Sequence, residues 1–276
     1  MKKKSGKAIW VIVLIVSILV CLLCVGFLFK YYFYDPTQII PKDPTPTNEA
    51  TAQVTDTTET SVPTQPPTER FVETTATLPQ DDFVDFEELM EINPDIYAWI
   101  YIPNTNVDYP VAQSARGVDD SFYLTHNVYK NYQFSGTIYT EKQNSRDFTD
   151  PVTVLYGHNM LNGSMFASLH NFNDETFFND NNTIFVFTKD KILTYYIYSA
   201  YQYDDRHILN SFDMSESTSF REFLDSTLLE RPYYCNVRKD IKLSDNDRII
   251  TLSTCMNGGG NVRYLVQGVL VNEQES

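Results

Sequence analysis

The sequence predicts a mainly β fold with a few helices, attached to a single N-terminal transmembrane helix. Three observations support this prediction: a long uncharged apolar run near the N-terminus, a Thr- and Pro-rich stretch after it, and many short β-prone runs in the rest of the 276 residues. The net charge of −15 argues against a nucleic-acid partner, because nucleic-acid binding needs Lys and Arg to displace counterions.

Residues 8–29 form an uncharged run rich in Val, Ile, Leu and Phe. A helix of this length spans about 33 Å, enough to cross a hydrocarbon core of about 30 Å. Basic residues flank the run: Lys2, Lys3, Lys4, Lys7 and Lys30. The positive-inside rule therefore predicts a cytoplasmic tail at 1–7 and a single-pass cell-membrane protein whose remainder is extracellular. A cleaved signal peptide is the alternative, but the run is longer than usual and no A-x-A-like cleavage site follows it.

Residues 30–80 are predicted to be a disordered extracellular tether. From 35 to 80 the chain holds 13 Thr and 8 of its 13 prolines, and no Gly. Its few apolar residues show no period, so this stretch is not expected to bury enough surface to offset the entropy of ordering. The composition changes at residue 81, and 81–276 is predicted to be one folded domain.

The domain is predicted to open with a helix that Asp82 caps and Asn93-Pro94 ends. Its apolar face is expected to hold Phe83, Phe86, Leu89 and Met90. Short β-prone runs follow, the clearest at 152–156, 184–188, 193–201, 249–253 and 264–271. The pattern Ser219-x-x-Glu222 resembles a capping box and predicts a second helix there. Many strands with few helices favour a β-barrel or a β-sandwich decorated by helices.

Two strand ends carry residues suited to covalent catalysis. Cys255 ends the run 249–254 and precedes a loop, a place that is both rigid and accessible. His158 follows the run 152–156 after Gly157, and Arg263 begins the last run, eight residues beyond Cys255. An imidazole can protonate a leaving amine, and a guanidinium can hold a substrate or stabilise an oxyanion. Together the three residue types suit a thiol nucleophile with its acid/base and an anion stabiliser.

Other readings of these residues stay open at this point. Cys255 could be a buried small residue or form a disulfide with Cys235, and Arg263 could make a surface ion pair. The remaining histidines, His126, His170 and His207, do not follow strands and are predicted to be surface or packing residues. No zinc-binding spacing and no phosphate loop occurs, so no cofactor is predicted.

The motifs around these residues resemble the sortases, cysteine transpeptidases of Gram-positive cell surfaces. The matching residues are Leu155-Tyr156-Gly157-His158 and Thr251-Leu252-Ser253-Thr254-Cys255, followed by Arg263. The resemblance implies that Cys255 is the nucleophile that forms a thioacyl intermediate and that His158 is the general acid/base. It implies that Arg263 stabilises the oxyanion or substrate, and that Ser253 and Leu124 contact the substrate.

The resemblance is to class B sortases and covers nearly the whole domain. The matching stretches lie at 85–100, 102–111 and 157–166, and the helix expected near 220–229 is similar to the extra helix of class B enzymes. The implied fold is a closed β-barrel of about eight strands with N-terminal helices and that extra helix before the Cys255 strand. The chain departs from the family pattern at Tyr97-Ala98-Trp99, where many relatives have a Gly, and in the glycine-containing loop after Cys255.

The implied activity is cleavage of a C-terminal sorting motif, commonly of the L-P-x-T-G type or a class B variant, on a secreted protein. The acyl group would pass to a cell-wall amine, from a peptidoglycan cross-bridge or lipid II, without a cofactor. One alternative is a pilin-polymerising sortase that uses a pilin Lys; such enzymes often carry a C-terminal membrane helix, and no second apolar run follows Leu270. The other is a non-catalytic tethered binding module.

Overall fold

The computed structural model describes residues 14, 16–18, 20–24, 74–79, 84–256 and 261–276. The predicted cytoplasmic tail, most of the predicted membrane segment and tether, and residues 257–260 of the glycine loop lie outside these ranges. The described residues between 14 and 24 are helical, and within the described ranges no helix is both long and apolar enough to cross a membrane. The predicted membrane anchor and the predicted domain boundaries therefore stay predictions.

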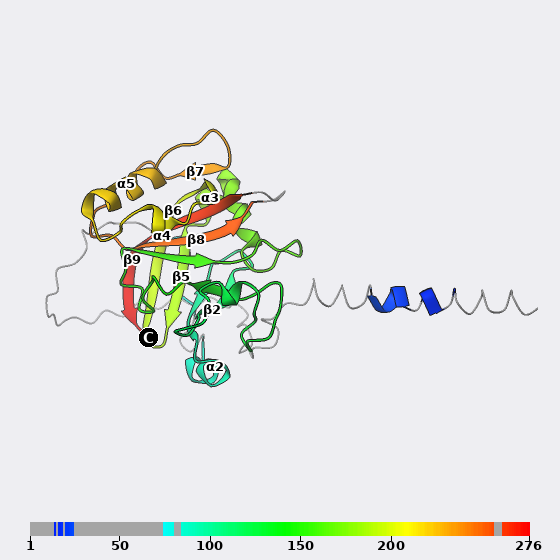
Figure 1. Cartoon of the computed structure of the whole chain (residues 1–276). Helices are drawn as coiled ribbons and strands as arrows, with labels where there is room; N and C mark the ends of the chain where they lie inside the picture. Colours follow the sequence, from blue (N-terminus) through cyan, green and yellow to red (C-terminus); the bar gives the residue numbers. More distant parts are fainter. Residues whose placement is uncertain (1–13, 15, 19, 25–73, 80–83, 257–260) are drawn as a thin grey trace, which may run out of the picture.

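Eight strands form a closed β-barrel (Figure 1). The strands are β1 (Ile96–Tyr101), β2 (Asp108–Gln113), β3 (Ile138–Thr140), β4 (Val152–Tyr156), β5 (Thr183–Thr188), β6 (Lys191–Asp204), β8 (Ile249–Cys255) and β9 (Val262–Glu275). Their order is β5-β1-β2-β3-β4-β8-β9-β6, and the β5–β6 pairing closes the barrel. This confirms the closed barrel that the resemblance implies and excludes the open sandwich.

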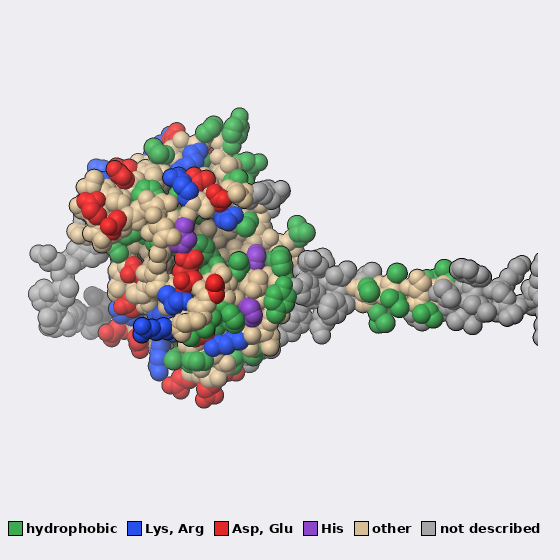
Figure 2. All heavy atoms as spheres, in the orientation of Figure 1, with side chains coloured by type: hydrophobic (Ala, Val, Ile, Leu, Met, Phe, Trp, Pro, Cys, Tyr) green, Lys and Arg blue, Asp and Glu red, His purple; other side chains and the backbone are tan. Residues whose placement is uncertain are grey.

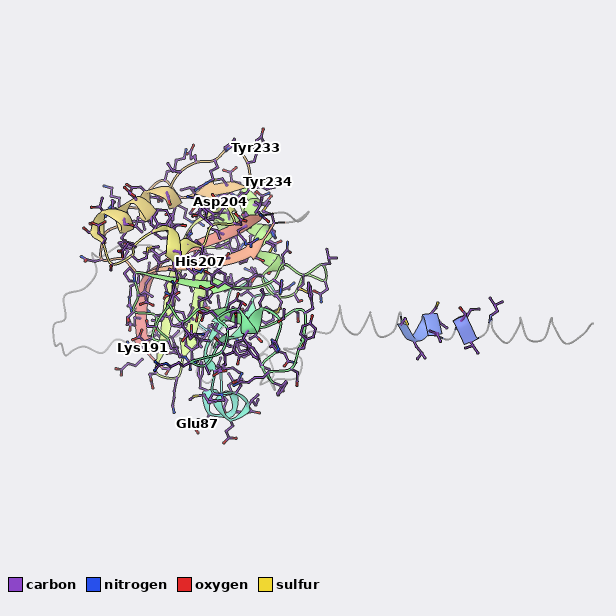
Figure 3. The ribbon with its side chains drawn as sticks, in the orientation of Figure 1. Glu87, Lys191, Asp204, His207, Tyr233 and Tyr234 are labelled. Carbon is purple, nitrogen blue, oxygen red and sulfur yellow. The ribbon has the colours of Figure 1, made fainter. Side chains whose placement is uncertain are left out.

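The barrel mixes parallel and antiparallel pairs. The β2–β3 and β4–β8 pairs are parallel, and the others are antiparallel. The long strand β6 runs from Lys191 to Asp204, which lie at opposite ends of the domain in Figure 3. Beyond its pairing with β5, it also carries the short strand β7 (Cys235–Val237) at Ser199–Tyr201. The parallel β4–β8 pair matters most for function, because His158 follows β4 and Cys255 ends β8.

Helices cover the outside of the barrel. They are α2 (Phe86–Ile92), η2 (Phe122–Leu124), η3 (Ala167–Asn173), α3 (Glu175–Asp180), α4 (Ile208–Ser211) and α5 (Ser217–Thr227). The face of α5 that holds Phe220, Phe223 and Leu224 is buried and packs with Ile208 of α4 against the outer side chains of the barrel. This is the extra helix expected between His158 and Cys255.

Both predicted helix starts are wrong by three residues. The carboxylate of Asp85, rather than Asp82, accepts the N–H groups of Glu87 and Glu88 and caps α2. Helix α5 begins at Ser217, where Glu216 caps it by accepting the N–H of Ser219. In each case an acidic side chain three residues away from the predicted cap accepts hydrogen bonds from N–H groups of the first helical turn, which have no partner within the helix.

The last described residues of the predicted tether pack on the barrel. The N–H of Thr75 donates to Oδ1 of Asn182 over 2.7 Å. Ala76 and Leu78 lie against the cluster of buried side chains that includes Trp99. Residues 74–79, which precede the predicted start of the domain at residue 81, therefore contact the folded domain.

Candidate active site

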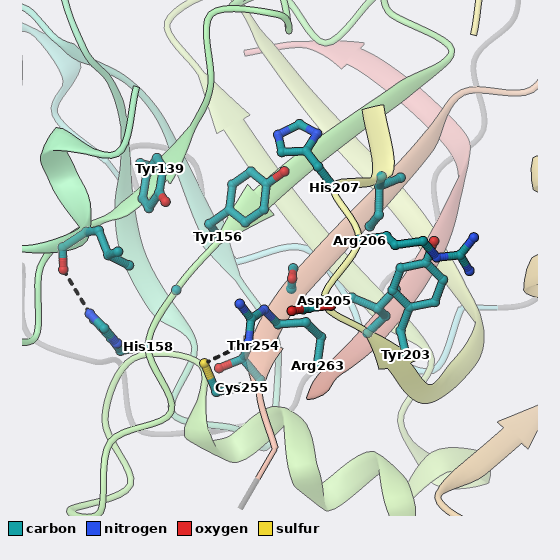
Figure 4. A pocket seen from close by; sticks show the side chains of 15 residues that line it. Tyr139, Tyr156, His158, Tyr203, Asp205, Arg206, His207, Thr254, Cys255 and Arg263 are labelled. Carbon is teal, nitrogen blue, oxygen red and sulfur yellow. Dashed lines mark hydrogen bonds between the residues drawn. The ribbon is translucent and has the colours of Figure 1, made fainter. Parts of the chain in front are cut away.

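Strands β8 and β9 place Cys255 and Arg263 directly opposite each other. Their register runs without a shift from Ile249 to Cys255. Because the N–H of Met256 bonds the carbonyl of Val262, the neighbouring Cys255–Arg263 pair is of the non-hydrogen-bonded kind. Side chains of such pairs lie on one face and close together. Nη1 of Arg263 accordingly lies 3.6 Å from Sγ of Cys255 (Figure 4).

The parallel pairing of β4 with β8 brings His158 to the same end of the barrel. Tyr156 lies opposite Ser253, and the N–H of Gly157 then bonds the carbonyl of Ser253. A Cβ atom on Gly157 would lie 2.5 Å from Cδ1 of Ile138 and 2.7 Å from Cδ2 of Phe166. A larger residue at the point where the chain leaves β4 and turns to His158 would therefore have to displace these buried side chains.

The imidazole of His158 is held from two sides. Its Nε2 lies 2.9 Å from the carbonyl oxygen of Leu124, and its ring stacks on Phe134 at 5.1 Å between centroids. A carbonyl oxygen only accepts, so Nε2 carries the proton of this hydrogen bond. Burial lowers the pKa of His158 below its ordinary value, and the bond to Leu124 opposes that shift. The lowered pKa favours the neutral ring, in which the proton lies on Nε2 and Nδ1 is unprotonated.

All five predicted site residues line one pocket of about 260 Å³. They are Leu124, His158, Ser253, Cys255 and Arg263. In Figure 4, His158 lies on one side of Cys255, and Tyr203, Asp205, Arg206 and His207 lie on the other. The aromatic part of the pocket lining includes Tyr139 and Tyr156, whose rings stack at 5.4 Å. The lining thus combines aromatic and charged side chains.

Two histidines that were predicted to be surface or packing residues belong to this region. Nε2 of His170 lies 3.0 Å from the backbone oxygen of Cys255. His207 lines the pocket (Figure 4), and its Nε2 lies 2.5 Å from Oε2 of Glu141. Both side chains are half-buried and make packing contacts, as predicted, but each also reaches a partner far away in the chain that no local pattern indicates. His126 is a packing residue as predicted, stacked on Phe122 at 3.9 Å.

The two cysteines of the domain are not joined. Cys255 is exposed and Cys235, at the start of β7, is half-buried; both are free thiols. Sγ of Cys235 instead lies 3.7 Å from the carbonyl oxygen of Leu229. The alternative of a Cys235–Cys255 disulfide is therefore excluded, and the thiol of Cys255 is available for chemistry.

Comparison with known proteins identifies the family. The model of the sortase domain matches residues 100–271. Sortase B of Listeria monocytogenes is 35% identical over 194 residues, which are 68% of this chain and 75% of that protein. Sortase B of Staphylococcus aureus is 28% identical over 170 residues, or 62% and 67% of the two chains.

Solved structures agree with this result. The crystal structure of Clostridium perfringens sortase B superposes with a TM-score of 0.59 at 34% identity, covering 68% of this chain and all of that chain. A Staphylococcus aureus sortase B–substrate complex gives 0.59 at 26% identity, covering 68% and 84%. With the closed eight-stranded barrel and the extra helix α5, these matches establish that the chain belongs to the sortase family of cysteine transpeptidases and is a class B sortase.

Proposed function

We propose that this sortase cleaves a C-terminal sorting motif of secreted proteins and joins the acyl part to a cell-wall amine. The observation that carries the proposal is the exposed Cys255 thiol, with the Arg263 guanidinium beside it, in a pocket that His158 also lines. A related protein, Staphylococcus aureus sortase B, has been solved as a complex with a substrate, which supports substrate binding by this fold.

In the proposed first half-reaction, Sγ of Cys255 attacks the carbonyl carbon of the motif's Thr. The proton of the thiol passes to His158, which gives it to the nitrogen of the departing amine as the C–N bond breaks. The products are a thioester on Cys255 and a free amine. The guanidinium of Arg263 stabilises the oxyanion that forms during the attack, since it is charged at every working pH.

In the proposed second half-reaction, an amine of a peptidoglycan cross-bridge or lipid II attacks the thioester. A C–N bond forms and the C–S bond breaks, while His158 takes the proton of this amine and gives it to the leaving sulfur of Cys255, so that the products are the new amide and the free thiol. Ser253 and Leu124, which line the pocket beside Cys255, are proposed to contact the motif. Water in place of the amine gives hydrolysis.

The cellular setting is also a proposal. We propose that residues 8–29 anchor the enzyme in the cell membrane, with the N-terminus in the cytoplasm and the barrel outside. The uncharged apolar run and its flanking lysines support this arrangement. The secreted substrates and the cell-wall acceptor then lie on the same side as the barrel.

The proposal is tested by mixing the full chain with a library of sorting-motif peptides and a panel of amines, including oligoglycine. Ligated products identified by mass are expected for one motif class, and the Cys255→Ala variant is expected to form none. Cleavage without ligation to any amine would reject transpeptidation to a cell-wall amine. Ligation to only the Lys side chain of a pilin subunit would favour the pilin-polymerising alternative.

A further inference from the structure

The backbone carbonyl of Cys255 lies where the sheet no longer supplies a partner. In the non-hydrogen-bonded pair with Arg263, the backbone groups of Cys255 point away from β9 and toward the β4 side. Strand β4 pairs with β8 only as far as Tyr156, opposite Ser253, two residues short of Cys255. The peptide group that follows the thiol therefore needs donors from elsewhere.

Two side chains occupy that position. Nδ2 of Asn159 donates to the oxygen of Cys255 over 3.0 Å, and Nε2 of His170 lies 3.0 Å from the same oxygen. The two nitrogens are themselves 3.1 Å apart. A carbonyl oxygen has two lone pairs, so it can accept from both side chains at once.

Each of the two side chains is held by its own element. Asn159 follows His158 in the loop after β4, where it bridges to Met165. His170 lies in η3, and its ring stacks on Tyr264 of β9 at 4.9 Å between centroids. The stack on Tyr264 orients the His170 ring toward the Cys255 carbonyl, and Tyr264 lies in β9 next to Arg263.

The proton on His170 determines how this contact works. When Nε2 carries the proton, both side chains donate to the Cys255 oxygen; when it does not, Nε2 accepts from Asn159 and only Asn159 holds the carbonyl. Burial lowers the pKa of His170, and the bond to the Cys255 carbonyl opposes that shift. A neutral ring with its proton on Nε2 therefore suffices for the two-donor arrangement.

We propose that Asn159 and His170 are positioning residues that fix the peptide group of Cys255 and thereby aim its thiol toward Arg263. This inference rests on the proposed role of Cys255 as the nucleophile. Neither residue is expected to touch the reacting atoms. Their effect is on the direction of the Cα–Cβ bond of Cys255, since the peptide group beside it is clamped by two donors at the open end of β8.

The test compares two substitutions of His170 in the full chain. His170→Phe keeps a ring that can stack on Tyr264 but removes the N–H donor, whereas His170→Gln keeps an N–H donor of similar reach. His170→Phe is expected to lower kcat for motif cleavage on the order of ten-fold with KM unchanged, because small displacements of a reacting group reduce rate rather than binding. His170→Gln is expected to recover most of that loss.

A second readout does not depend on the peptide substrate. The rate at which iodoacetamide alkylates Cys255 at neutral pH, followed by mass at the Cys255 peptide, is expected to fall in His170→Phe and in Asn159→Leu. Asn171→Ala, an exposed neighbour of His170 in η3, is the matched control and is expected to match the wild type.

The outcomes separate this inference from the proposed function. Unchanged kcat and alkylation in His170→Phe and Asn159→Leu would overturn the positioning role while leaving Cys255 as the nucleophile. A rise in KM alone would also overturn it, by making His170 a substrate contact, and so would equal losses in the Phe and Gln variants. If thermal unfolding shows that His170→Phe does not fold, Asn159→Leu decides. Peptide cleavage by Cys255→Ala would instead reject the proposed function.

Discussion

At the scale of single residues, His158 shows how the barrel prepares a histidine. Its Nε2–H is engaged by the carbonyl of Leu124 and one ring face by Phe134. Burial lowers the pKa of the ring, so that only a small part of the population is protonated at neutral pH. In the proposed mechanism the proton that His158 donates therefore comes from Cys255 during the attack.

The lowered pKa predicts how stability depends on pH. In the unfolded chain the histidine titrates near its ordinary pKa of about 6.5, and in the folded protein it titrates lower. Between these two values the unfolded state binds more protons, so the free energy of unfolding falls as the pH is lowered through about 6.5. Replacing His158 with Phe removes this contribution.

Denaturant unfolding at neutral and at acidic pH measures the effect. The loss of unfolding free energy between the two pH values is expected to be smaller in His158→Phe than in the wild type. The same loss in both proteins would contradict a lowered pKa for His158.

Among the elements, the short helix η2 contains Leu124, whose carbonyl holds His158, and the turn at Gly136 packs against this carbonyl. Gly136 has a positive φ of 60°, and a Cβ atom there would press on the carbonyl oxygens of Tyr123 and Leu124. Gly117 also has a positive φ, of 87°, but a Cβ atom there would meet nothing within 4 Å. Substituting Ala at Gly117 measures the cost of the left-handed backbone alone, whereas substituting Ala at Gly136 adds the clash with the two carbonyls.

Gly117→Ala is expected to cost on the order of 1 kcal/mol of stability, from the left-handed backbone alone. Gly136→Ala is expected to cost about 1–3 kcal/mol more, because the added methyl group must displace two backbone carbonyls. It is also expected to lower kcat/KM, since one of these carbonyls holds His158. Denaturant unfolding and peptide cleavage of both variants check this, and equal stability losses with kcat/KM intact in both would contradict the role given to η2.

The ends of elements also show where local sequence misleads. Asp82 and Asp85 are both possible caps for the first helix, and Asp85 is the one whose carboxylate meets the first-turn N–H groups. The Ser219-x-x-Glu222 pattern lies inside α5, because Glu216 already caps the helix three residues earlier. Several capping residues in a row leave the start of a helix undetermined by pattern alone.

In the molecule as a whole, the strands with long apolar, β-prone sequences could be predicted. The five predicted runs coincide with β4, β5, β6, β8 and β9, although the last four are longer than predicted. Strands β3 and β7 have only three residues each, too few for a period, and β2 contains Pro110. Their pairing depends on long-range contacts, so a local pattern could not distinguish a barrel from a sandwich; the family resemblance could.

The candidate site could also be predicted in part: its three central residues could be found from the sequence, but the contact of His170 could not. Cys255, His158 and Arg263 were recognisable because each lies at a strand end, and strand ends meet at one edge of the sheet. The contact of His170 with Cys255 joins residues 85 positions apart. It depends on where η3 packs, which no motif in the sequence encodes.

The negative net charge of the chain lies in residues 81–276. Residues 1–80 hold seven basic and seven acidic side chains, so the whole charge of −15 lies in 81–276. Figure 2 shows acidic side chains gathered over α5 and α2 on the face in view. The cationic Arg263 beside Cys255 is a local exception in an acidic domain, which suits the stabilisation of negative charge during acyl transfer.

If Cys255 is the nucleophile, it carries the acyl group as a thioester, and the intact mass of the protein reveals this adduct. The full chain is mixed with an intact sorting-motif peptide, of a class that it cleaves, in the absence of an added amine. We expect a mass increase equal to the acyl fragment, located to the Cys255 peptide, released by hydroxylamine, retained in Cys235→Ser and absent from Cys255→Ala. An acyl adduct on another residue, or peptide turnover by Cys255→Ala, would contradict the account.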